Sequence, residues 1–280
     1  MKVIGVGDNV VDQYLYKRTM YPGGNALNFS VYAKQLGVES AYLGVFGSDR
    51  AAEHIAETLR TLEVDLSHCR YHEGENGYAQ VDLVDGERVF IGGNGGGVQK
   101  EHPIILTDED LEYIKTFEIA HSSIYSNMVE ELQKLKAAGV MVSFDFSADY
   151  NYEILEITCK HVDVSLLSCG QLKEEEVEEL LKRVHGLGSS LAIGTLGSRG
   201  SIVYDGQSFY RHKPHFVQPV DTLGAGDSFF TAFILHYLKG KKENQARGDA
   251  ELIVSSLEEG AKFAAKTCLV DGAFGFGISF

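Results

Sequence analysis

The segment Val220–Phe230 reads VDTLGAGDSFF and places small residues and a carboxylate directly before an apolar stretch. Gly224, Ala225 and Gly226 allow the backbone to come close to a ligand. The stretch FFTAFILHYL follows at once and predicts a helix that begins at these residues. Unpaired amides and the positive end of the helix dipole would point at the ligand there, which favours an anionic phosphoryl group.

Asp227 lies in the first turn of this predicted helix, where its carboxylate can accept the proton of an attacking hydroxyl. An anion cradle with a base beside it is the arrangement that phosphoryl transfer requires. The alternative is structural: the glycines form a turn, and Asp227 only complements the helix dipole. The other motifs of the chain favour the catalytic interpretation.

A second motif, YPGGNALNFSVYAKQLG, predicts another helix with polar residues at its start. Gly23 and Gly24 precede this helix, and Asn25 and Asn28 share one face because they are three residues apart. Their amide groups can both donate to and accept from the hydroxyls of a sugar. The alternative is that Asn25 caps the helix and Asn28 is merely tolerated.

Two carboxylates, Asp8 and Asp12, follow the first predicted strand in GDNVVDQY. Carboxylates at the carboxyl end of a strand can hold two vicinal hydroxyls, although either could equally be a turn residue. A further segment, GTLGSRGS, follows another buried strand, and its Thr195, Gly197 and Gly200 form a tight turn that could line a nucleotide. It is not a Walker A loop, and no GxGxxG follows the first strand, which excludes a Rossmann dehydrogenase. Alone, it is as consistent with a plain turn between strands.

The elements that must position these residues alternate along the chain. Short apolar runs predict strands at Lys2–Val6, Ala41–Phe46, Val140–Asp145, Val164–Leu167, Leu191–Thr195 and Ser201–Tyr204. Amphipathic stretches predict helices at Asn25–Leu36, Arg50–Leu62, Met128–Ala138, Lys173–Arg183, Ala225–Lys239 and Ala250–Lys266. Strand, helix and strand at this spacing predict parallel crossovers, and therefore an α/β fold with helices on both faces of one sheet.

Two segments depart from this alternation, at about residues 10–21 and 71–101. The second has an alternating pattern with Asp85-Gly86 as a hairpin signal, followed by a glycine-rich run. We expect the two segments to pair into a small separate sheet, a lid over the carboxyl ends of the main strands. Residues 1–280 would then form a single domain with a discontinuous lid.

Composition excludes several other classes of protein. The chain has 280 residues, 44% of them hydrophobic, and a net charge of −15, so binding to nucleic acid or to an anionic membrane is not expected. Its N-terminus lacks the long apolar region of a secretory signal, and we expect a cytoplasmic protein. The four cysteines have neither CxxC nor zinc-ligand spacing, so we expect reduced thiols.

At these motifs the chain resembles the ribokinase-like carbohydrate kinases, also called the PfkB family. The resemblance runs from Val3 to about Gly272, with DTLGAGDSF as its most specific segment and GGNALN as the next. It implies a three-layer α/β/α sandwich with a mainly parallel sheet and a small β lid. It also implies ATP as phosphoryl donor, Mg²⁺, and transfer of the γ-phosphoryl group to a sugar hydroxymethyl.

The resemblance also implies roles for individual residues. Asp227 would be the catalytic base, and the backbone of Gly224, Ala225 and Gly226 the anion hole. Sugar contacts would come from Asp12, Gly23, Gly24, Asn25 and Asn28. The ATP site would be lined by Thr195, Gly197, Gly200, Ala261, Ala264 and Ala265. Asp221 and Leu223 match the position where many members bind a monovalent cation such as K⁺.

One segment departs from the family pattern. Members usually carry Asn-x-x-Glu after a central strand, where it organises the water shell of magnesium. This chain has Ser168-Cys169-Gly170-Gln171 there, and Gln171 supplies no negative charge. The resemblance therefore implies weaker or differently placed magnesium, while the base and the anion hole are retained.

Within the family, the segments IGVGDNVVDQY, AHSSIY and FDFS resemble the kinases that phosphorylate the 6-hydroxyl of a fructosamine such as fructoselysine. An acidic lid and cleft rim would suit the positive charge of that substrate, with Asp8 and Asp12 as candidates. The alternatives are a kinase for fructose, ribose, 2-keto-3-deoxygluconate or a nucleoside, and a non-catalytic sugar- or nucleotide-binding regulator. The lid strands could also pair two chains into a homodimer.

Overall fold

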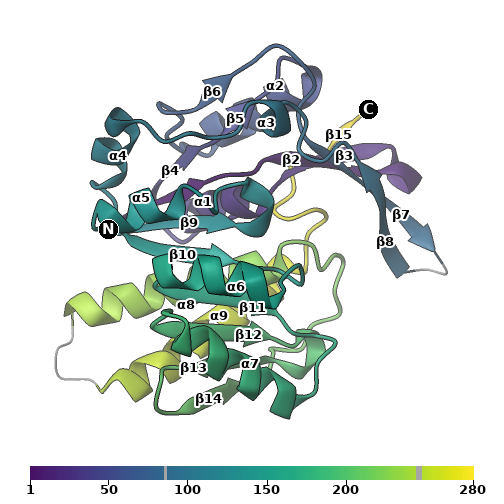
Figure 1. Ribbon diagram of the computed structural model, residues 1–280. Coiled ribbons are helices and arrows are strands. Elements are labelled where there is room, and N and C mark those ends of the chain that lie inside the picture. Colours follow the sequence, from purple (N-terminus) through teal and green to yellow (C-terminus); the bar gives the residue numbers. More distant parts are fainter. Residues whose placement is uncertain (85–86, 244–247) are drawn as a thin grey trace.

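A computed structural model describes residues 1–84, 87–243 and 248–280. Its main feature is an eight-stranded sheet with the order β14-β13-β12-β11-β10-β9-β1-β4 (Figure 1). Its strands are β1 (Lys2–Val6), β4 (Glu39–Leu43), β9 (Ile119–Ser123), β10 (Met141–Asp145), β11 (Val164–Ser168), β12 (Leu191–Thr195), β13 (Ser201–Tyr204) and β14 (Phe209–His212).

The strands from β12 to β4 run parallel, and β13 and β14 extend the sheet antiparallel at one edge. Val3 pairs with Ser40 on one side and with Ile119 on the other, so β1 lies inside the sheet. Its near-continuous apolar sequence suits a strand that is buried on both faces. The mainly parallel α/β fold predicted from the sequence is confirmed.

Helices cover both faces of this sheet. The helices are α1 (Asn25–Gln35), α2 (Arg50–Thr61), α3 (Val98–Glu101), α4 (Asp108–Ile114), α5 (Leu132–Ala137), α6 (Tyr152–Thr158), α7 (Glu174–Gly186), α8 (Ala225–Glu243) and α9 (Asp249–Thr267). Short 3-10 turns occur at η1 (Leu15–Lys17), η2 (Ile124–Ser126), η3 (Cys159–His161) and η4 (Gly197–Arg199). One apolar core joins the sheet to α1, α8 and α9, and a second joins it to α4, α5, α6 and α7. The result is a three-layer sandwich.

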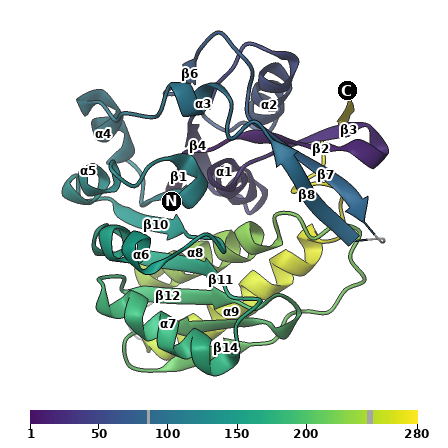
Figure 2. The same cartoon turned by 45° about the vertical axis from the view of Figure 1, so that its right-hand side comes forward.

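A second, five-stranded sheet has the order β15-β3-β2-β7-β8 and stands out from the main body on one side (Figures 1 and 2). Its strands are β2 (Val10–Tyr14), β3 (Thr19–Gly23), β7 (Tyr78–Val84), β8 (Glu87–Gly93) and β15 (Ile278–Ser279). β2 pairs parallel with β7, which joins the two segments that depart from the alternating pattern. β15 adds a strand near the C-terminus that the sequence did not predict.

Some predicted elements differ from the structure. The strand expected at residues 41–46 divides into β4 and β5 (Val45–Phe46), and β5 pairs instead with β6 (Arg70–Tyr71). The helix expected at residues 128–138 begins only at Leu132, since residues 127–131 form turns. β9, α4, α6 and β14 were not predicted. The Asp85-Gly86 hairpin signal lies outside the described residues.

Among the described residues, no helix combines the length and the apolar character needed to cross a membrane.

Candidate active site

A cavity of about 1010 Å³ opens at the carboxyl ends of the parallel strands, between the main sheet and the five-stranded sheet. This is where open α/β sheets bind their ligands. Of the residues singled out from the sequence, it is lined by Asp8, Asp12, Gly24, Asn25, Asn28, Thr195, Leu223, Gly224, Ala225, Gly226 and Asp227. We call it the polar cavity.

The start of α8 brings Asp227 to this cavity. Gly224 has a φ of +73°, and a Cβ there would lie 2.2 Å from the Tyr32 hydroxyl, so the turn before the helix requires glycine. The first amides of α8 have no partner within the helix, because they lie in its first turn. Gly226 and Asp227 follow in that turn, and both face the cavity. The start of α8 therefore brings a helix N-terminus and a carboxylate together, with the Ala225 amide donating to the Thr222 carbonyl at 3.2 Å.

α1 begins on the opposite side of the cavity and is capped by a residue far from it in sequence. Gly24, with a φ of +118°, has no side chain to cap the helix, and a Cβ there would lie 2.7 Å from the Asp8 carbonyl. Asp8 caps the helix instead: its carboxylate accepts from the amides of Asn25 at 2.6 Å and Ala26 at 3.3 Å. Asn25 is the first helical residue, so it is not the cap that the structural alternative proposed.

Asp8 also ties α1 to the end of β9. Its Oδ1 accepts from the hydroxyls of Ser123 at 2.9 Å and Ser126 at 2.7 Å. With the two amides of α1, this makes four protein donors, which is about the capacity of one carboxylate. Asp8 therefore mainly holds the walls of the cavity together, with three of these bonds at Oδ1 and one at Oδ2.

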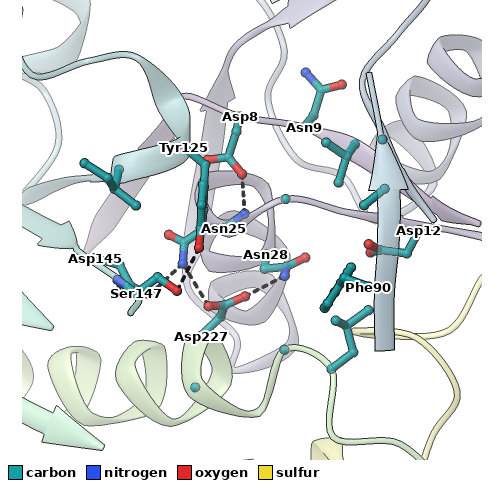
Figure 3. A pocket seen from close by; sticks show the side chains of 18 of the residues that line it. Asp8, Asn9, Asp12, Asn25, Asn28, Phe90, Tyr125, Asp145, Ser147 and Asp227 are labelled. Atoms are coloured by element: carbon teal, nitrogen blue, oxygen red, sulfur yellow. Dashed lines mark hydrogen bonds between the residues drawn. The ribbon is translucent and has the colours of Figure 1, made fainter. Parts of the chain in front are cut away.

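Asn25 and Asn28 both donate hydrogen bonds to Asp227 (Figure 3). Asn28 Nδ2 lies 2.6 Å from Asp227 Oδ2, and Asn25 Nδ2 lies 2.9 Å from Asp227 Oδ1. Asn25 Nδ2 also donates to Asp145 Oδ2 at 2.7 Å. One amide group thus bridges two carboxylates, and both oxygens of Asp227 are held in place.

His121 fixes the orientation of this bridging amide. Its Nε2 lies 2.9 Å from Asn25 Oδ1, which can only accept, so Nε2 carries the proton. Its Nδ1 lies 2.9 Å from the Ser143 hydroxyl and accepts from it. Burial lowers the pKa of His121 to about 3, so the ring is neutral. The chain Ser143–His121–Asn25 therefore aims the Asn25 amide at both carboxylates.

The carboxylates of the polar cavity are hard to ionise together. Burial, and next the negative charge of Asp145, raise the pKa of Asp227 to about 8. Burial, and next Asp8, raise the pKa of Asp12 to about 7, and burial raises the pKa of Asp145 to about 6. Among the described residues that line the cavity there is no Lys or Arg. The site thus collects negative charge with no basic side chain to balance it.

Asp12 projects from β2, which pairs with β3, the strand that leads into α1. It is 5% exposed, and its carboxylate lies over Gly23, where a Cβ would come within 2.4 Å of Asp12 Oδ2. Nearby, Asn28 Oδ1 is buried, and within the described chain no group donates to it. A free carboxylate and a free amide oxygen at this end can bind a ligand that carries hydroxyls.

A second cavity, of about 420 Å³, lies between α8, α9 and the turn after β12. We call it the apolar cavity. It is lined by all six residues expected at a nucleotide site, namely Thr195, Gly197, Gly200, Ala261, Ala264 and Ala265. Thr195, Thr222, Ala225 and Gly226 line both cavities. The two cavities therefore meet at the N-terminus of α8, beside Asp227.

Residues 212–217, with Pro219, form one wall of the apolar cavity, and the sequence did not point to them. Phe216 in this segment is 92% exposed although it is a large apolar side chain. An exposed aromatic ring at the edge of a cavity offers a surface on which a planar ligand can stack.

Asp221, expected at a monovalent cation site, is buried and lines neither cavity. Its carboxylate accepts from the Tyr14 hydroxyl at 2.6 Å and from the amides of Leu223 at 2.8 Å and Gly272 at 2.9 Å. These bonds join the loop before α8 to the small sheet and to the segment after α9.

The segment that replaces Asn-x-x-Glu follows β11. Ser168 is exposed and lines the polar cavity, whereas Gln171 is exposed and does not. Between them Cys169 is buried, which raises its thiol pKa to about 11, so it offers no thiolate to a metal. Across the described part of the chain, no group of three or more His, Cys, Asp or Glu is arranged to hold a metal ion.

Sequence reasoning missed three residues of the polar cavity region as individual site residues: Asp145, His121 and Tyr125. Asp145 is a lone carboxylate at the carboxyl end of a buried parallel strand, and that position alone could have drawn attention to it. His121 lies 96 residues from its partner Asn25, and their contact depends on β9 lying next to β1. No local pattern carries that information.

Comparisons with known proteins agree with this geometry. The family model for pfkB family carbohydrate kinases matches residues 3–268. The chain is 39% identical over 281 residues to fructosamine kinase FrlD of Bacillus subtilis, covering 100% of this chain and 95% of that protein. It is 32% identical over 269 residues to fructoselysine 6-kinase of Escherichia coli, covering 96% and 98%.

Solved structures give the same fold. The ribokinase of Arabidopsis thaliana complexed with ribose and ATP superposes with a TM-score of 0.80 at 23% identity, covering 98% of this chain and 94% of that one. An Escherichia coli structure described as a putative ribokinase II in complex with ATP and Mg²⁺ has a TM-score of 0.78 at 20% identity, with the same coverage. The ribokinase-like sandwich is thereby confirmed, and this chain belongs to the pfkB family of carbohydrate kinases.

Proposed function

We propose that this kinase transfers the γ-phosphoryl group of ATP to the 6-hydroxyl of a fructosamine such as fructoselysine. The observation that carries the proposal is the place of Asp227: a carboxylate held by two amides at the helix end where the polar and apolar cavities meet. The two relatives named as fructosamine and fructoselysine kinases support the choice of sugar.

Asp227 is the general base of the proposed reaction. Its raised pKa, about 8, matches a base that must take a hydroxyl proton near neutral pH. As the proton passes to Asp227, the attacking oxygen bonds to the γ-phosphorus, the bond from that phosphorus to the β-phosphate oxygen breaks, and ADP leaves. The group in transfer lies against the amides of Gly224, Ala225 and Gly226. Those amides and the dipole of α8 stabilise the charge that develops on the phosphoryl oxygens.

The sugar lies in the polar cavity, with its hydroxyls toward Asp12, Gly24, Asn25 and Asn28. Asn28 offers both a donor and a free acceptor, and Asp12 an acceptor, which suits vicinal hydroxyls. Four carboxylates with no Lys or Arg among the described lining residues favour a cationic sugar over a neutral or anionic one. A fructosamine carries its positive charge on the amine at C1.

ATP lies in the apolar cavity, with adenine against Ala261, Ala264 and Ala265 and its phosphates toward Thr195 and the start of α8. When bound, Mg²⁺ supplies charge neutralisation on the phosphates. Ser168 is the polar side chain of the altered segment that faces the polar cavity, so the metal rests mainly on ATP and water. A Mg²⁺ titration in which activity saturates once Mg²⁺ matches ATP supports this; a further rise in activity with Mg²⁺ in excess of ATP argues against it, because it indicates an ion held by the protein.

A monovalent cation beside Asp221 and Leu223 stays a prediction. A fructokinase from Vibrio cholerae was solved with potassium bound, at 22% identity to this chain. In this chain the Asp221 carboxylate already accepts three protein hydrogen bonds, which leaves little room for a cation. Turnover in K⁺ compared with Li⁺ buffers decides the question.

The five-stranded sheet acts as the lid, closing over the sugar and excluding water that would hydrolyse ATP. Residues 1–280 then work as one domain.

We also propose a homodimer through the lid, because β8 is an edge strand on which Val89, Phe90 and Ile91 are exposed. Light scattering of the purified protein gives the mass. The four free cysteines are consistent with a cytoplasmic protein.

Coupled ADP release with ATP and Mg²⁺ tests the function across fructoselysine, other fructosamines, fructose, ribose, 2-keto-3-deoxygluconate and adenosine. Strong turnover on fructosamines alone supports the reaction and the substrate. Preference for another sugar keeps the kinase and removes the fructosamine. Silence across the panel from folded protein favours a binding-only regulator.

A further inference from the structure

We propose that Asp145 is the residue that binds the positively charged amine of the substrate, with the ring of Tyr125 as the neighbouring wall. This inference rests on the proposed function, because it takes the substrate to be a fructosamine. It assigns to one carboxylate the distinction between an amine-bearing sugar and a neutral one.

Two of the four carboxylates in the polar cavity are committed to other tasks. Asp8 accepts four hydrogen bonds from the protein, three at Oδ1 and one at Oδ2, which is twice the number that Asp145 accepts. Asp227, at the start of α8, is the proposed general base and contacts the reacting hydroxyl. Asp12 and Asp145 remain as partners for the amine.

Asp12 and Asp145 lie on opposite sides of Asn25 and Asp227 in Figure 3. On the Asp12 side, the nearby Asn28 presents a buried oxygen with no described donor. That oxygen needs a ligand group that donates, and the Asp12 carboxylate needs another. Neighbouring sugar hydroxyls meet both needs and can also accept from the protein in turn. The Asp12 side thus suits the sugar ring.

The Asp145 side offers acceptors and an aromatic face. Asp145 is 5% exposed, and each of its oxygens has one protein donor: Asn25 Nδ2 at 2.7 Å and the Ser147 amide at 2.7 Å. A carboxylate has about four acceptor sites, so half of its capacity remains. A secondary ammonium has two N–H groups and no acceptor, and it matches this side.

Two hydrogen bonds of the Tyr125 hydroxyl fix the orientation of its ring beside Asp145. The hydroxyl lies 2.7 Å from Asp149 Oδ2, to which it donates, and 3.0 Å from the Ser147 hydroxyl, from which it accepts. The side chain lines the cavity although it is 51% exposed. A ring fixed at this position can attract a cation to its face.

The same side leads out of the cavity. From the buried Asp145 the wall continues to the partly exposed Ser147 and then to the exposed Asp149. The amine of a fructosamine carries a second substituent, the amino-acid chain, which must leave the cavity toward solvent. An amine at Asp145 allows that exit past Tyr125, while the sugar 6-hydroxyl reaches Asp227 across the bridging amide of Asn25.

The test compares an N-alkyl fructosamine with its 1-O-alkyl ether, which keeps the shape and lacks the charge. The measured quantity is the ratio of kcat/KM for the amine to that for the ether. In wild type we expect a clear preference for the amine. In Asp145→Asn we expect the ratio to fall by about 30-fold or more, mainly through KM for the amine, as for loss of one partner of a buried charge pair.

Asp12→Asn is the matched control, because it removes a carboxylate of the same cavity with the same change of shape. We expect it to lower kcat/KM for both compounds and to leave the ratio within about 3-fold. A ratio that is unchanged in Asp145→Asn, or that falls in Asp12→Asn instead, overturns the assignment and leaves the proposed function standing. If wild type does not phosphorylate the amine, both fail.

Loss of turnover in Asp145→Asn on both compounds still leaves a decisive measurement. The 6-deoxy forms of the amine and of the ether lack the reacting hydroxyl, and calorimetry gives their Kd values without chemistry. The same fall in the amine-to-ether ratio, now of association constants, supports the assignment. Equal weakening of both 6-deoxy compounds overturns it.

Discussion

The polar and apolar cavities share Ala225 and Gly226, yet they are built in different ways. The polar cavity depends on side chains that hydrogen-bond to one another across β1, α1, β9, β10 and α8. The apolar cavity depends on the absence of bulk along α9 and in the turn after β12. The polar cavity is therefore shaped by hydrogen-bonded side chains, and the apolar cavity by the small size of the residues that line it.

This difference predicts which property a substitution in each cavity should affect. A hydrogen-bonded network holds its members within tenths of an ångström, so removing one of them changes the chemistry or the choice of sugar. A cavity of small residues tolerates changes that leave its volume intact, and it responds when that volume is filled. Substitutions in the two cavities should therefore separate into effects on turnover and effects on ATP binding.

The largest effect is expected at the point where the cavities meet. Asp227→Ala should lower kcat by about 10²–10⁴-fold, because it removes the proposed general base and leaves the proposed anion hole in place. The KM for ATP should change little, because Asp227 does not line the apolar cavity. Steady-state kinetics with both substrates measures this. Near-normal turnover in the variant would sink the assignment of the base.

Gly226 sharpens the comparison because it lines both cavities. Apart from its chain neighbours and the backbone of its own helix, no atom of the described residues lies within 4 Å of a Cβ at this position, so Gly226→Val should fold without loss of Tm. The new side chain would occupy the space beside the amides, and kcat/KM should fall by about 10²-fold through misplacement of the phosphoryl group.

Gly224→Ala is the control for this experiment, two residues earlier in the turn that precedes α8. A Cβ there would lie 2.2 Å from the Tyr32 hydroxyl and on backbone with a φ of +73°. We expect a clear loss of Tm in this variant, which Gly226→Val should not show. An equal loss of Tm in both variants would mean that the space beside Gly226 is not open. A fall in kcat/KM of Gly226→Val could then not be assigned to the position of the phosphoryl group.

On the apolar side alone, Ala265→Leu should raise the KM for ATP by about 10-fold, since overfilling a packed site costs about 1–3 kcal/mol. The Kd for the fructosamine should stay the same, because Ala265 lines only the apolar cavity. Steady-state kinetics measures the KM for ATP, and calorimetry measures the Kd for the fructosamine. A matching loss of sugar affinity would show that the two cavities are coupled.

The residues expected at a nucleotide site come together in one cavity more completely than those expected at the sugar site, for a physical reason. All six expected nucleotide residues line it, because small residues in a turn and on one helix face are visible as local patterns. In the polar cavity, Asp12, Asn25 and Asn28 were found beside predicted helices or strands. Asp145 was missed as a site residue, since its function depends on which strands are neighbours.

His121 shows the same limit. In AHSSIY it resembles any polar residue of a buried strand, and only the order β9-β1 brings it to α1. Similarly, β15 is two residues long and exists because β3 offers it a pairing edge, not because of its own composition. Local patterns predicted the motifs, whereas the order of the strands decided which motifs share a site.

The smallest effect concerns stability and follows from the charge of the polar cavity. Asp227, Asp12 and Asp145 have pKa values raised to about 8, 7 and 6, above the ordinary value of 3.8. Between pH 4 and 8 the folded protein keeps protons that the unfolded chain has lost. Stability of the unliganded protein should therefore fall as pH rises through this range.

Asp227→Asn removes one of these buried charges without changing the shape of the side chain. We expect its Tm to exceed that of wild type by a few degrees at pH 8 and to approach it at about pH 3, below the ordinary pKa of 3.8, where the wild-type carboxyl is mostly protonated in both states. Ala265→Leu serves as the control, because its effect on Tm should not depend on pH. Thermal melts across this pH range measure the difference. A Tm gain that is the same at every pH would mean that the variant stabilises the protein by packing. It would also mean that the ionised Asp227 carboxylate does not lower the stability of the folded protein.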